Sequence, residues 1–285
     1  MDPDFRRLAA LRRFMVRGDQ RALPDFGRQK LRDWIARHAG PLPDTVTIAP
    51  LEDMEGRYFQ PAEPTDRLLV YIHGGGLVYH DTQSFAPFLA GLADQAGCAV
   101  AALDYPKAPE TDPLTIRAAL ARDVALLRRQ YAGRRIALAG DSVGGLLALL
   151  FAEGWSGAPL AALHLIYPVA DLVLEDGAPY GTGHFLDAEM MAWFYSFIRP
   201  LVADRPAALP EFNLPLPPVT IHIAECDILA AGAGRLADGL RRGGQQVTEV
   251  LHRDLPHDFC LFQGASPAAR EAVARIAQLV AEGFG

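Results

Sequence analysis

Residues 135–153 read RIALAGDSVGGLLALLFAE, and this stretch decides the fold. Its first five residues form a short apolar run typical of a buried strand, whereas residues 143–153 have the apolar spacing of a helix. A turn as tight as GDSVGG strains the backbone of Ser142, and Gly140 and Gly144 leave the necessary room around it. We therefore predict a strand, a sharp turn and a helix, with the Ser142 hydroxyl exposed at the carboxyl end of a sheet.

The same alternation continues on both sides of this stretch. Further apolar runs, which suit strands buried on both faces of a parallel sheet, occupy residues 68–72, 98–103, 162–168, 219–224 and 247–252. Helical patterns lie between or after them at residues 85–96, 113–131, 230–242 and 267–284. Alternating strands and helices predict an α/β sheet with right-handed crossovers. Residues 45–50 and 57–61 are expected to form an antiparallel pair leading into it.

Composition excludes several classes of protein. The 285 residues are 50% hydrophobic, enough for a core of one large or two small domains, and this excludes a disordered chain. The net charge of −7 disfavours a nucleic-acid binder. The sequence contains no run of about 18 apolar residues, so we predict no membrane-spanning helix. The first 19 residues hold no apolar run long enough for secretion, and the three cysteines are scattered, so we expect a cytoplasmic protein.

A second glycine-rich segment, HGGG at residues 73–76, follows the apolar run at 68–72. Consecutive glycines leave backbone N–H groups uncovered, which is what an oxyanion hole requires. A phosphate cradle is the competing interpretation, but the spacing matches neither common phosphate-binding motif. A plain turn is the simplest alternative, and the serine turn 69 residues downstream makes it less attractive.

A nucleophilic serine needs a base, and that base needs a carboxylate. Six of the eight histidines are better explained by strands, by the glycine loop or by atypical segments: His38, His73, His80, His164, His184 and His222. His252 and His257 remain, and His257 is favoured because it follows Pro256 beyond the last predicted strand. Asp227, directly after a strand, is favoured as the acid over Asp254 and Asp258.

Five segments together carry a family resemblance: HGGG (73–76), DYPKAPE (104–110), GDSVGG (140–145), ECDIL (225–229) and PHDF (256–259). Over residues 45–285 the chain resembles the hormone-sensitive-lipase-like α/β-hydrolases, in their bacterial carboxylesterase branch. The resemblance implies an α/β-hydrolase fold, with an eight-stranded, mostly parallel sheet flanked by helices and a helical cap. Residues 1–44 and 175–212 would be the cap, and residues 45–174 and 213–285 the catalytic core.

The resemblance also implies roles for individual residues. Ser142 would be the nucleophile, Asp227 the acid and His257 the base, with Asp141 and Glu110 supporting the loops around them. The oxyanion hole would be made by backbone N–H groups of Gly75, Gly76 and Val143. We expect the substrate to contact Leu77, Phe185, Met190 and Phe194. No cofactor is implied, and no cluster of His, Cys and Asp has the spacing of metal ligands.

The sequence departs from the family pattern in three places. Tyr105-Pro106-Lys107 replaces the family's tyrosine-arginine-leucine, Asp258 stands where a glycine often follows the histidine, and the acid loop lacks a second carboxylate. These differences leave substrate preference open. The apolar segment AEMMAWFYSFI at residues 188–198 is equally open, because it suits either a core helix or a lid over a pocket.

The expected activity is hydrolysis of small or medium acyl esters or lactones through an acyl-enzyme. Amide or N-acyl hydrolysis is the first alternative, because the same residues serve both bonds. A non-catalytic small-molecule receptor on this fold is the second. The expected partner is a small-molecule ester bound by a monomer or a homodimer.

Overall fold

The computed structural model describes residues 1–15, 24–173, 179–181, 185–203 and 215–285. Its centre is an eight-stranded sheet in the order β1-β2-β4-β3-β5-β6-β7-β8. The strands are β1 (Val46–Pro50), β2 (Gly56–Pro61), β3 (Arg67–Ile72), β4 (Ala99–Leu103), β5 (Arg135–Asp141), β6 (Leu163–Ile166), β7 (Val219–Cys226) and β8 (Val247–Pro256). β2 pairs antiparallel with β1 and with β4, and all other neighbours are parallel. The predicted mostly parallel, eight-stranded sheet is therefore confirmed.

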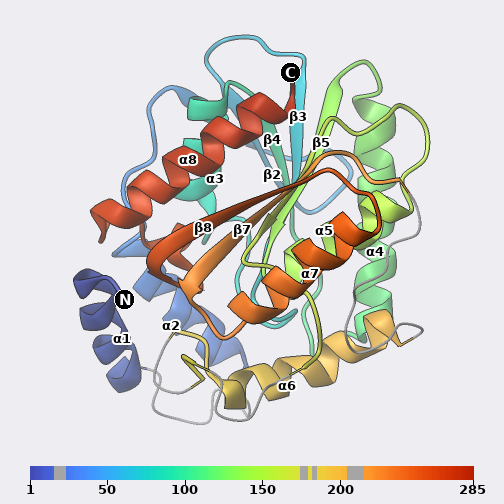
Figure 1. Cartoon of the computed structure of the whole chain (residues 1–285). Helices are drawn as coiled ribbons and strands as arrows, with labels where there is room; N and C mark the ends of the chain where they lie inside the picture. Colours follow the sequence, from blue (N-terminus) through green and yellow to red (C-terminus); the bar gives the residue numbers. More distant parts are fainter. Residues whose placement is uncertain (16–23, 174–178, 182–184, 204–214) are drawn as a thin grey trace.

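Helices cover both faces of this sheet, as Figure 1 shows. One face carries α3 (Ala86–Ala96) and α8 (Pro267–Gly283), and the other carries α4 (Pro113–Gln130), α5 (Val143–Glu153) and α7 (Ala230–Arg242). Two hydrophobic clusters follow this division, one on each side of the sheet. The short 3-10 helices are η1 (Arg199–Val202) and η2 (Phe259–Phe262).

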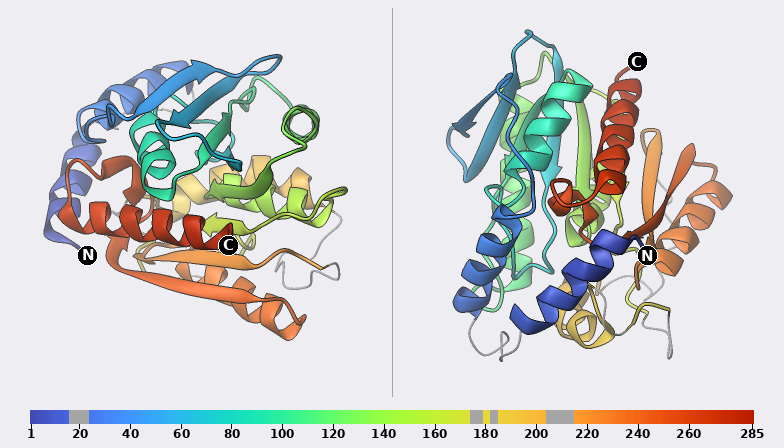
Figure 2. Two further views of the ribbon diagram at one scale, coloured as in Figure 1. Left: turned by 90° about the horizontal axis from the view of Figure 1, so that it is seen from above. Right: turned by 90° about the vertical axis from the view of Figure 1, so that its left-hand side faces the viewer.

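Three further helices gather at one end of the sheet. They are α1 (Pro3–Met15), α2 (Pro24–Ala36) and α6 (Ala188–Ile198), and both figures of the whole chain place them together (Figures 1 and 2). Met191, Tyr195 and Ile198 of α6 are buried in the core cluster shared with α4, α5 and α7. The parts of the predicted cap at residues 16–23, 175–178, 182–184 (with His184) and 204–212 lie outside the described residues.

The apolar pattern explains why the central strands form where they do. In β3 the residues from Leu68 to Ile72 are each at most 1% exposed, as expected for a parallel strand covered on both faces. Side-chain caps begin the long helices: Asp112 accepts from Leu114 N at 2.9 Å in α4, and Ser266 accepts from Ala269 N in α8.

β8 is longer than the sequence indicates. The prediction ended it at His252, but pairing with β7 continues to Pro256 through a register shift between Ala224 and Cys226. Asp254 adopts a φ of 60° within this irregular stretch, so the strand bends and still pairs beyond it. As a result, Cys226 lies opposite Pro256, and the next residue of each strand leaves the sheet at the same place. Within the described ranges, no helix is long and apolar enough to cross a bilayer.

Candidate active site

Ser142 occupies the turn between β5 and α5 with φ 54° and ψ −123°. A positive φ is strained for a residue with a side chain, and backbone hydrogen bonds of the Ser142 N–H and C=O groups hold it in place. The Ser142 N–H donates to Ile166 O at 3.0 Å, and its carbonyl accepts from Val169 N at 2.9 Å. A Cβ on Gly140 would collide with the backbone of Gly144, so the turn can close this tightly only with glycine. The predicted sharp turn therefore presents the Ser142 side chain at the carboxyl edge of the sheet.

His257 and Asp227 lie beside this serine because their strands are neighbours. Asp227 follows β7 and His257 follows β8, directly after the paired residues Cys226 and Pro256. His257 Nδ1 lies 2.6 Å from Asp227 Oδ2, and His257 Nε2 lies 3.1 Å from Ser142 Oγ. In the neutral ring, Nδ1 donates to the carboxylate, and Nε2 can then accept from the serine hydroxyl. All three side chains are buried.

Of the competing residues, His252 and Asp254 lie elsewhere, and Asp258 approaches the ring of His257 at its other nitrogen. His252 Nε2 is 3.1 Å from Nδ1 of His222, inside the sheet. Asp254 is exposed and accepts the N-terminal ammonium of Met1 at 2.8 Å. Asp258 has its Oδ1 3.7 Å from Nε2 of His257, on the opposite side of the ring from Asp227. The structure therefore brings together the three residues favoured from the sequence.

The charge environment of His257 favours its protonated form. Burial by itself would lower its pKa, but the neighbouring carboxylates of Asp227 and Asp258 outweigh burial and raise the pKa to about 9. A base that holds its proton this firmly is stabilised as an imidazolium once it has taken the proton of Ser142.

The glycine loop after β3 turns its backbone toward Ser142. Gly75 and Gly76 have φ values of +103° and +63°, which favour glycine, and a Cβ on Gly76 would collide with the ring of Phe194. The Gly75 carbonyl faces away from the site, because it accepts from Val78 N and Tyr79 N at 3.0 and 2.8 Å. Among the hydrogen bonds of the described residues, the N–H groups of Gly75, Gly76 and Val143 donate to no protein acceptor. Val143 is the first residue of α5, where an N–H has no partner within the helix.

Two buried side chains hold the loop from behind. Asp141 Oδ1 accepts from Gly74 N at 2.8 Å and from the Tyr71 hydroxyl at 2.7 Å. Burial raises the pKa of Asp141 to about 7, although the Tyr71 hydrogen bond acts in the opposite direction. The Tyr105 hydroxyl donates to the carbonyl of His73 at 2.9 Å, which fixes the start of the loop.

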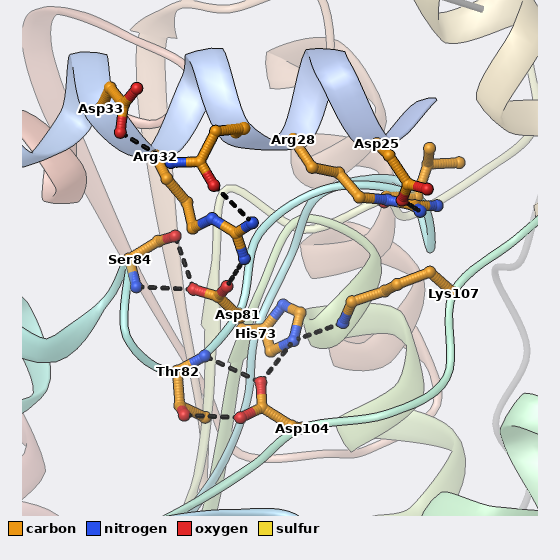
Figure 3. Close-up of polar contacts among 12 residues, drawn as sticks. Asp25, Arg28, Arg32, Asp33, His73, Asp81, Thr82, Ser84, Asp104 and Lys107 are labelled. Atoms are coloured by element: carbon orange, nitrogen blue, oxygen red, sulfur yellow. Dashed lines mark hydrogen bonds and ion pairs between the residues drawn. The ribbon is translucent and has the colours of Figure 1, made fainter. Parts of the chain in front are cut away.

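Lys107 reaches the same loop through His73, as Figure 3 shows. Its Nζ lies 2.9 Å from His73 Nε2 and 3.5 Å from the centroid of the Tyr105 ring. Because His73 Nδ1 lies 2.7 Å from the carbonyl oxygen of Gly74, which can only accept, the ring proton is on Nδ1, and Nε2 accepts from Lys107. Burial lowers the pKa of Lys107 to about 7. Its position in the altered Tyr-Pro-Lys triplet was the only sequence signal for this role.

Helix α2 is tied to this support by two arginines. Arg32 pairs with Asp81 at 2.8 Å, and Arg28 pairs with Glu110 at 2.8 Å and donates to Val78 O at 2.7 Å (Figure 3 labels both arginines). Glu110 thus links the loop after β4 to α2 through Arg28, and any support that it gives to Ser142 is indirect.

A small cavity of about 30 Å³ opens beside Ser142. Its lining comes from the glycine loop, the two catalytic candidates and the helices at this end of the sheet: Leu31, Gly75, Gly76, Tyr79, His80, Ser142, Leu186, Met190, Phe194, His257 and Asp258. Met190 and Phe194 are thus at the cavity, as expected. Sequence reasoning did not select Leu31, Tyr79, His80 or Leu186 for the lining.

Leu77 and Phe185, also expected to contact substrate, lie elsewhere. Leu77 is fully buried in the core on the α5 side of the sheet, because its φ of +67° turns the chain inward. Phe185 packs against the rings of Phe5, Trp34 and Phe262. Its neighbour Leu186 points to the cavity instead.

Glu225, Cys226 and Asp254 place three possible metal-ligand atoms within 4.8 Å of one another, a proximity created by the β7–β8 pairing. Protein groups already use two of these side chains. Glu225 accepts from the Asp254 N–H at 2.7 Å, and Asp254 accepts from the Met1 ammonium. These contacts give the cluster a structural role, because they join β7, β8 and the N-terminus.

Comparison with known proteins agrees with this geometry. Residues 69–261 match the family described as "alpha/beta hydrolase fold". The chain is 30% identical to the "Ethyl acetate hydrolase" of Pseudomonas putida over 89% of its own length and 88% of that protein. It is 31% identical to "Carboxylesterase NlhH" of Mycobacterium tuberculosis over 81% and 79% of the two chains.

Solved structures show the same fold. A thermostable esterase from Pseudomonas putida ECU1011 superposes with a TM-score of 0.87 at 23% identity, covering 100% of this chain and 98% of that one. An esterase from the bacterial hormone-sensitive lipase family gives a TM-score of 0.84 at 23% identity, with 100% and 99% covered. The chain therefore belongs to the α/β-hydrolase family and is a carboxylesterase.

Proposed function

We propose that Ser142, Asp227 and His257 form the catalytic triad of this carboxylesterase. The observation that carries the proposal is the continuous chain of contacts at 3.1 Å and 2.6 Å from Ser142 Oγ through His257 to Asp227. The strained turn at Ser142 and the burial of all three side chains support it.

In the proposed mechanism, His257 Nε2 takes the hydroxyl proton as Ser142 Oγ attacks the ester carbonyl. Asp227 holds the ring and stabilises the imidazolium. The N–H groups of Gly75, Gly76 and Val143 donate to the oxyanion, and each such donor typically lowers the barrier by about 2.7–4 kcal/mol. His257 then gives its proton to the leaving alcohol, and an acyl-enzyme remains on Ser142. Water, deprotonated by His257, attacks this ester and releases the acid.

We propose short acyl chains, acetyl above all, as the acyl part of the substrate. The small cavity beside Ser142 supports this, and so do two relatives of the chain, an ethyl acetate hydrolase and an acetyl-hydrolase of Streptomyces hygroscopicus. Phe194 lies against Gly76 and limits the space next to the oxyanion loop. We expect kcat/KM to fall from p-nitrophenyl acetate to the butyrate and the octanoate.

We further propose that residues 1–44 and 175–212 act as the cap, since Leu31 of α2 and Met190 of α6 both line the cavity. A cytoplasmic location is supported by three buried cysteines, none of which forms a disulfide: Cys98, Cys226 and Cys260.

The decisive experiment replaces the nucleophile. Ser142→Ala should lower kcat on p-nitrophenyl acetate by about 10⁶-fold and abolish covalent labelling by a fluorophosphonate, with unchanged circular dichroism. Ser196→Ala is the control, because that hydroxyl donates to Trp193 O on the exposed side of α6. Retained ester hydrolysis by Ser142→Ala would overturn the triad. Hydrolysis of an acetanilide as fast as that of phenyl acetate would favour an amidase instead.

A further inference from the structure

Asp258 brings a carboxylate into the cavity beside Ser142. It lines that cavity, and its side chain is 14% exposed. Its Oδ1 lies 3.7 Å from Nε2 of His257, the nitrogen that faces Ser142. The residue therefore meets whatever molecule occupies the site.

The Asp258 carboxylate has one charged neighbour in the protein, the His257 ring, whose pKa it helps to raise. Asp258 precedes η2 in a left-handed conformation, with φ 63° and ψ 11°, which costs free energy for any residue but glycine. Its side chain caps no helix, and only its backbone carbonyl is used, by Leu261 N at 2.9 Å. Among the hydrogen bonds of the described residues, none ends on the Asp258 carboxylate. A glycine would serve the backbone better, so the side chain itself needs an explanation.

The contact with Nε2 tells which part of the substrate Asp258 faces. In the proposed mechanism this nitrogen gives its proton to the oxygen of the leaving alcohol. A carboxylate 3.7 Å from Nε2 therefore lies next to the alcohol part of the ester, not the acyl part.

The rest of the described lining makes this side of the cavity suitable for a cation. Asp258 is its one carboxylate, no lysine or arginine contributes to it, and the one basic group beside Asp258 is the His257 ring, which must be neutral when it acts as the base. Tyr79 and Phe194, both in the lining, have ring centroids 5.9 Å apart at an angle of 72°. Aromatic faces attract ammonium groups, and a nearby carboxylate adds to that attraction.

We infer that the alcohol side of this site prefers esters whose alcohol part carries a positive charge, such as a quaternary ammonium, and that Asp258 sets this preference. The inference rests on the proposed function, because it places the leaving group next to His257. A neutral alcohol of the same shape gains no such attraction, and an anionic one is repelled.

The test compares two esters of equal shape. Acetylcholine and 3,3-dimethylbutyl acetate differ only in a charged nitrogen against a neutral carbon. We expect wild-type kcat/KM to be about tenfold higher for acetylcholine, and Asp258→Asn to bring the ratio close to one. Any effect of the substitution on the basicity of His257 acts on both esters and cancels in the ratio.

Asp254→Asn is the matched control. Asp254 is also an aspartate with positive φ, and its carboxylate lies outside the cavity. This variant should keep the wild-type ratio. A wild-type ratio near one, or a ratio that Asp258→Asn leaves unchanged, would overturn the inference.

A second measurement covers the case in which Asp258→Asn is inactive. Choline should inhibit the wild-type enzyme about tenfold more strongly than 3,3-dimethylbutanol, and equal inhibition would overturn the inference without any variant. Hydrolysis of 3,3-dimethylbutyl acetate that is lost in Ser142→Ala reports on the triad alone. Failure of the charge preference and failure of the proposed function are thereby separated.

Discussion

Two pairs of buried residues connect β7 with β8, one pair within the strands and one directly after them. Asp227 and His257 are 30 residues apart and in contact at 2.6 Å, and His222 and His252 are also 30 residues apart and in contact at 3.1 Å. Both pairs are buried and bridge the same two strands. The pKa of His257 is raised, whereas burial lowers the pKa of His252 to about 4 and that of His222 well below its ordinary value.

The difference lies in the partner. Burial alone makes an imidazole neutral, and a carboxylate in contact reverses that effect. His164 continues the neutral row on β6, with its ring stacked 6.2 Å from His222. At this sheet, the surroundings of His257 favour the protonated ring, whereas those of His164, His222 and His252 favour the neutral ring.

The largest expected effect separates these two kinds of histidine directly. His257→Gln should lower kcat by about 10⁶-fold, because the base is lost. His252→Gln should change kcat by less than about tenfold, because His252 contacts His222 and not Ser142. Steady-state kinetics on p-nitrophenyl acetate, with circular dichroism to verify folding, makes the comparison. Equal losses in the two variants would show that the row matters for catalysis.

Removing the carboxylate of Asp227 should lower the pKa of His257 toward the low values of the buried histidines His164, His222 and His252. Asp227→Asn is expected to lower kcat by about 10⁴-fold. In the wild type the base must be neutral to act, so kcat/KM should rise with pH up to about 9. Without the attraction of Asp227, the pKa falls and the inflection should move to lower pH. A pH–rate profile that keeps its inflection in the variant would contradict the role given to Asp227.

The sequence predicts the residues at the strand ends, Ser142 and Asp227, better than the side chains that line the cavity. Ser142 and Asp227 are recognisable because each follows a strand directly, and the ends of parallel strands meet at one edge. The choice of His257 over His252 depended on where β8 ends, and the register shift near Asp254 was not visible in the pattern.

The walls depend on packing between distant segments. Phe185 and Leu186 are equally apolar neighbours, and only the packing of Phe185 against Phe5 and Phe262 turns Leu186 to the cavity. Lys107 meets His73 across 34 residues of chain, in a loop whose family pattern it breaks. No periodicity carries such contacts, because they arise from loop conformation.

Acid should destabilise the folded protein through the neutral, buried histidines His164, His222 and His252. Burial lowers the pKa of His164 to about 4, below the ordinary value of about 6.5. The unfolded chain then binds more protons than the folded one between these two values, so this contribution is complete above pH 6.5 and is lost as the pH falls toward 4. His164→Leu should lessen the loss of unfolding free energy from pH 7 to pH 4 by about 2–3 kcal/mol.

Urea unfolding at both pH values measures this change. His38→Leu is the control, because His38 is only partly buried and its Nδ1 lies beside Trp34 O at 2.8 Å. An acid-induced loss as large in His164→Leu as in the wild type would show that the ring is not a neutral, buried group in the folded protein.

The smallest expected effect concerns His73, a buried histidine whose neighbour is a cation. Burial and the charge of Lys107 lower its pKa and outweigh the carboxylate of Asp104, whose Oδ1 lies 3.6 Å from Nε2, so the neutral ring can hold Gly74 O through Nδ1–H. Lys107→Met removes the donor to Nε2 and leaves Asp104 Oδ1, 3.6 Å away, as the polar neighbour of that nitrogen, so the hydrogen bonding that holds the ring changes. We expect kcat to fall about tenfold with KM nearly unchanged, because the oxyanion donors are displaced while the cavity walls remain.

Lys30→Met, which removes the other lysine of the chain, is the control and should leave kcat unchanged. A fall in melting temperature with unchanged kcat would show that Lys107 supports the fold alone. A fall in kcat at constant KM shows instead that a residue outside the cavity positions the loop through His73. In that case the three histidine environments differ in function as they do in charge: a carboxylate in contact makes His257 a base, a lysine and a carboxylate together hold the ring of His73, and the absence of both makes His164 a core residue.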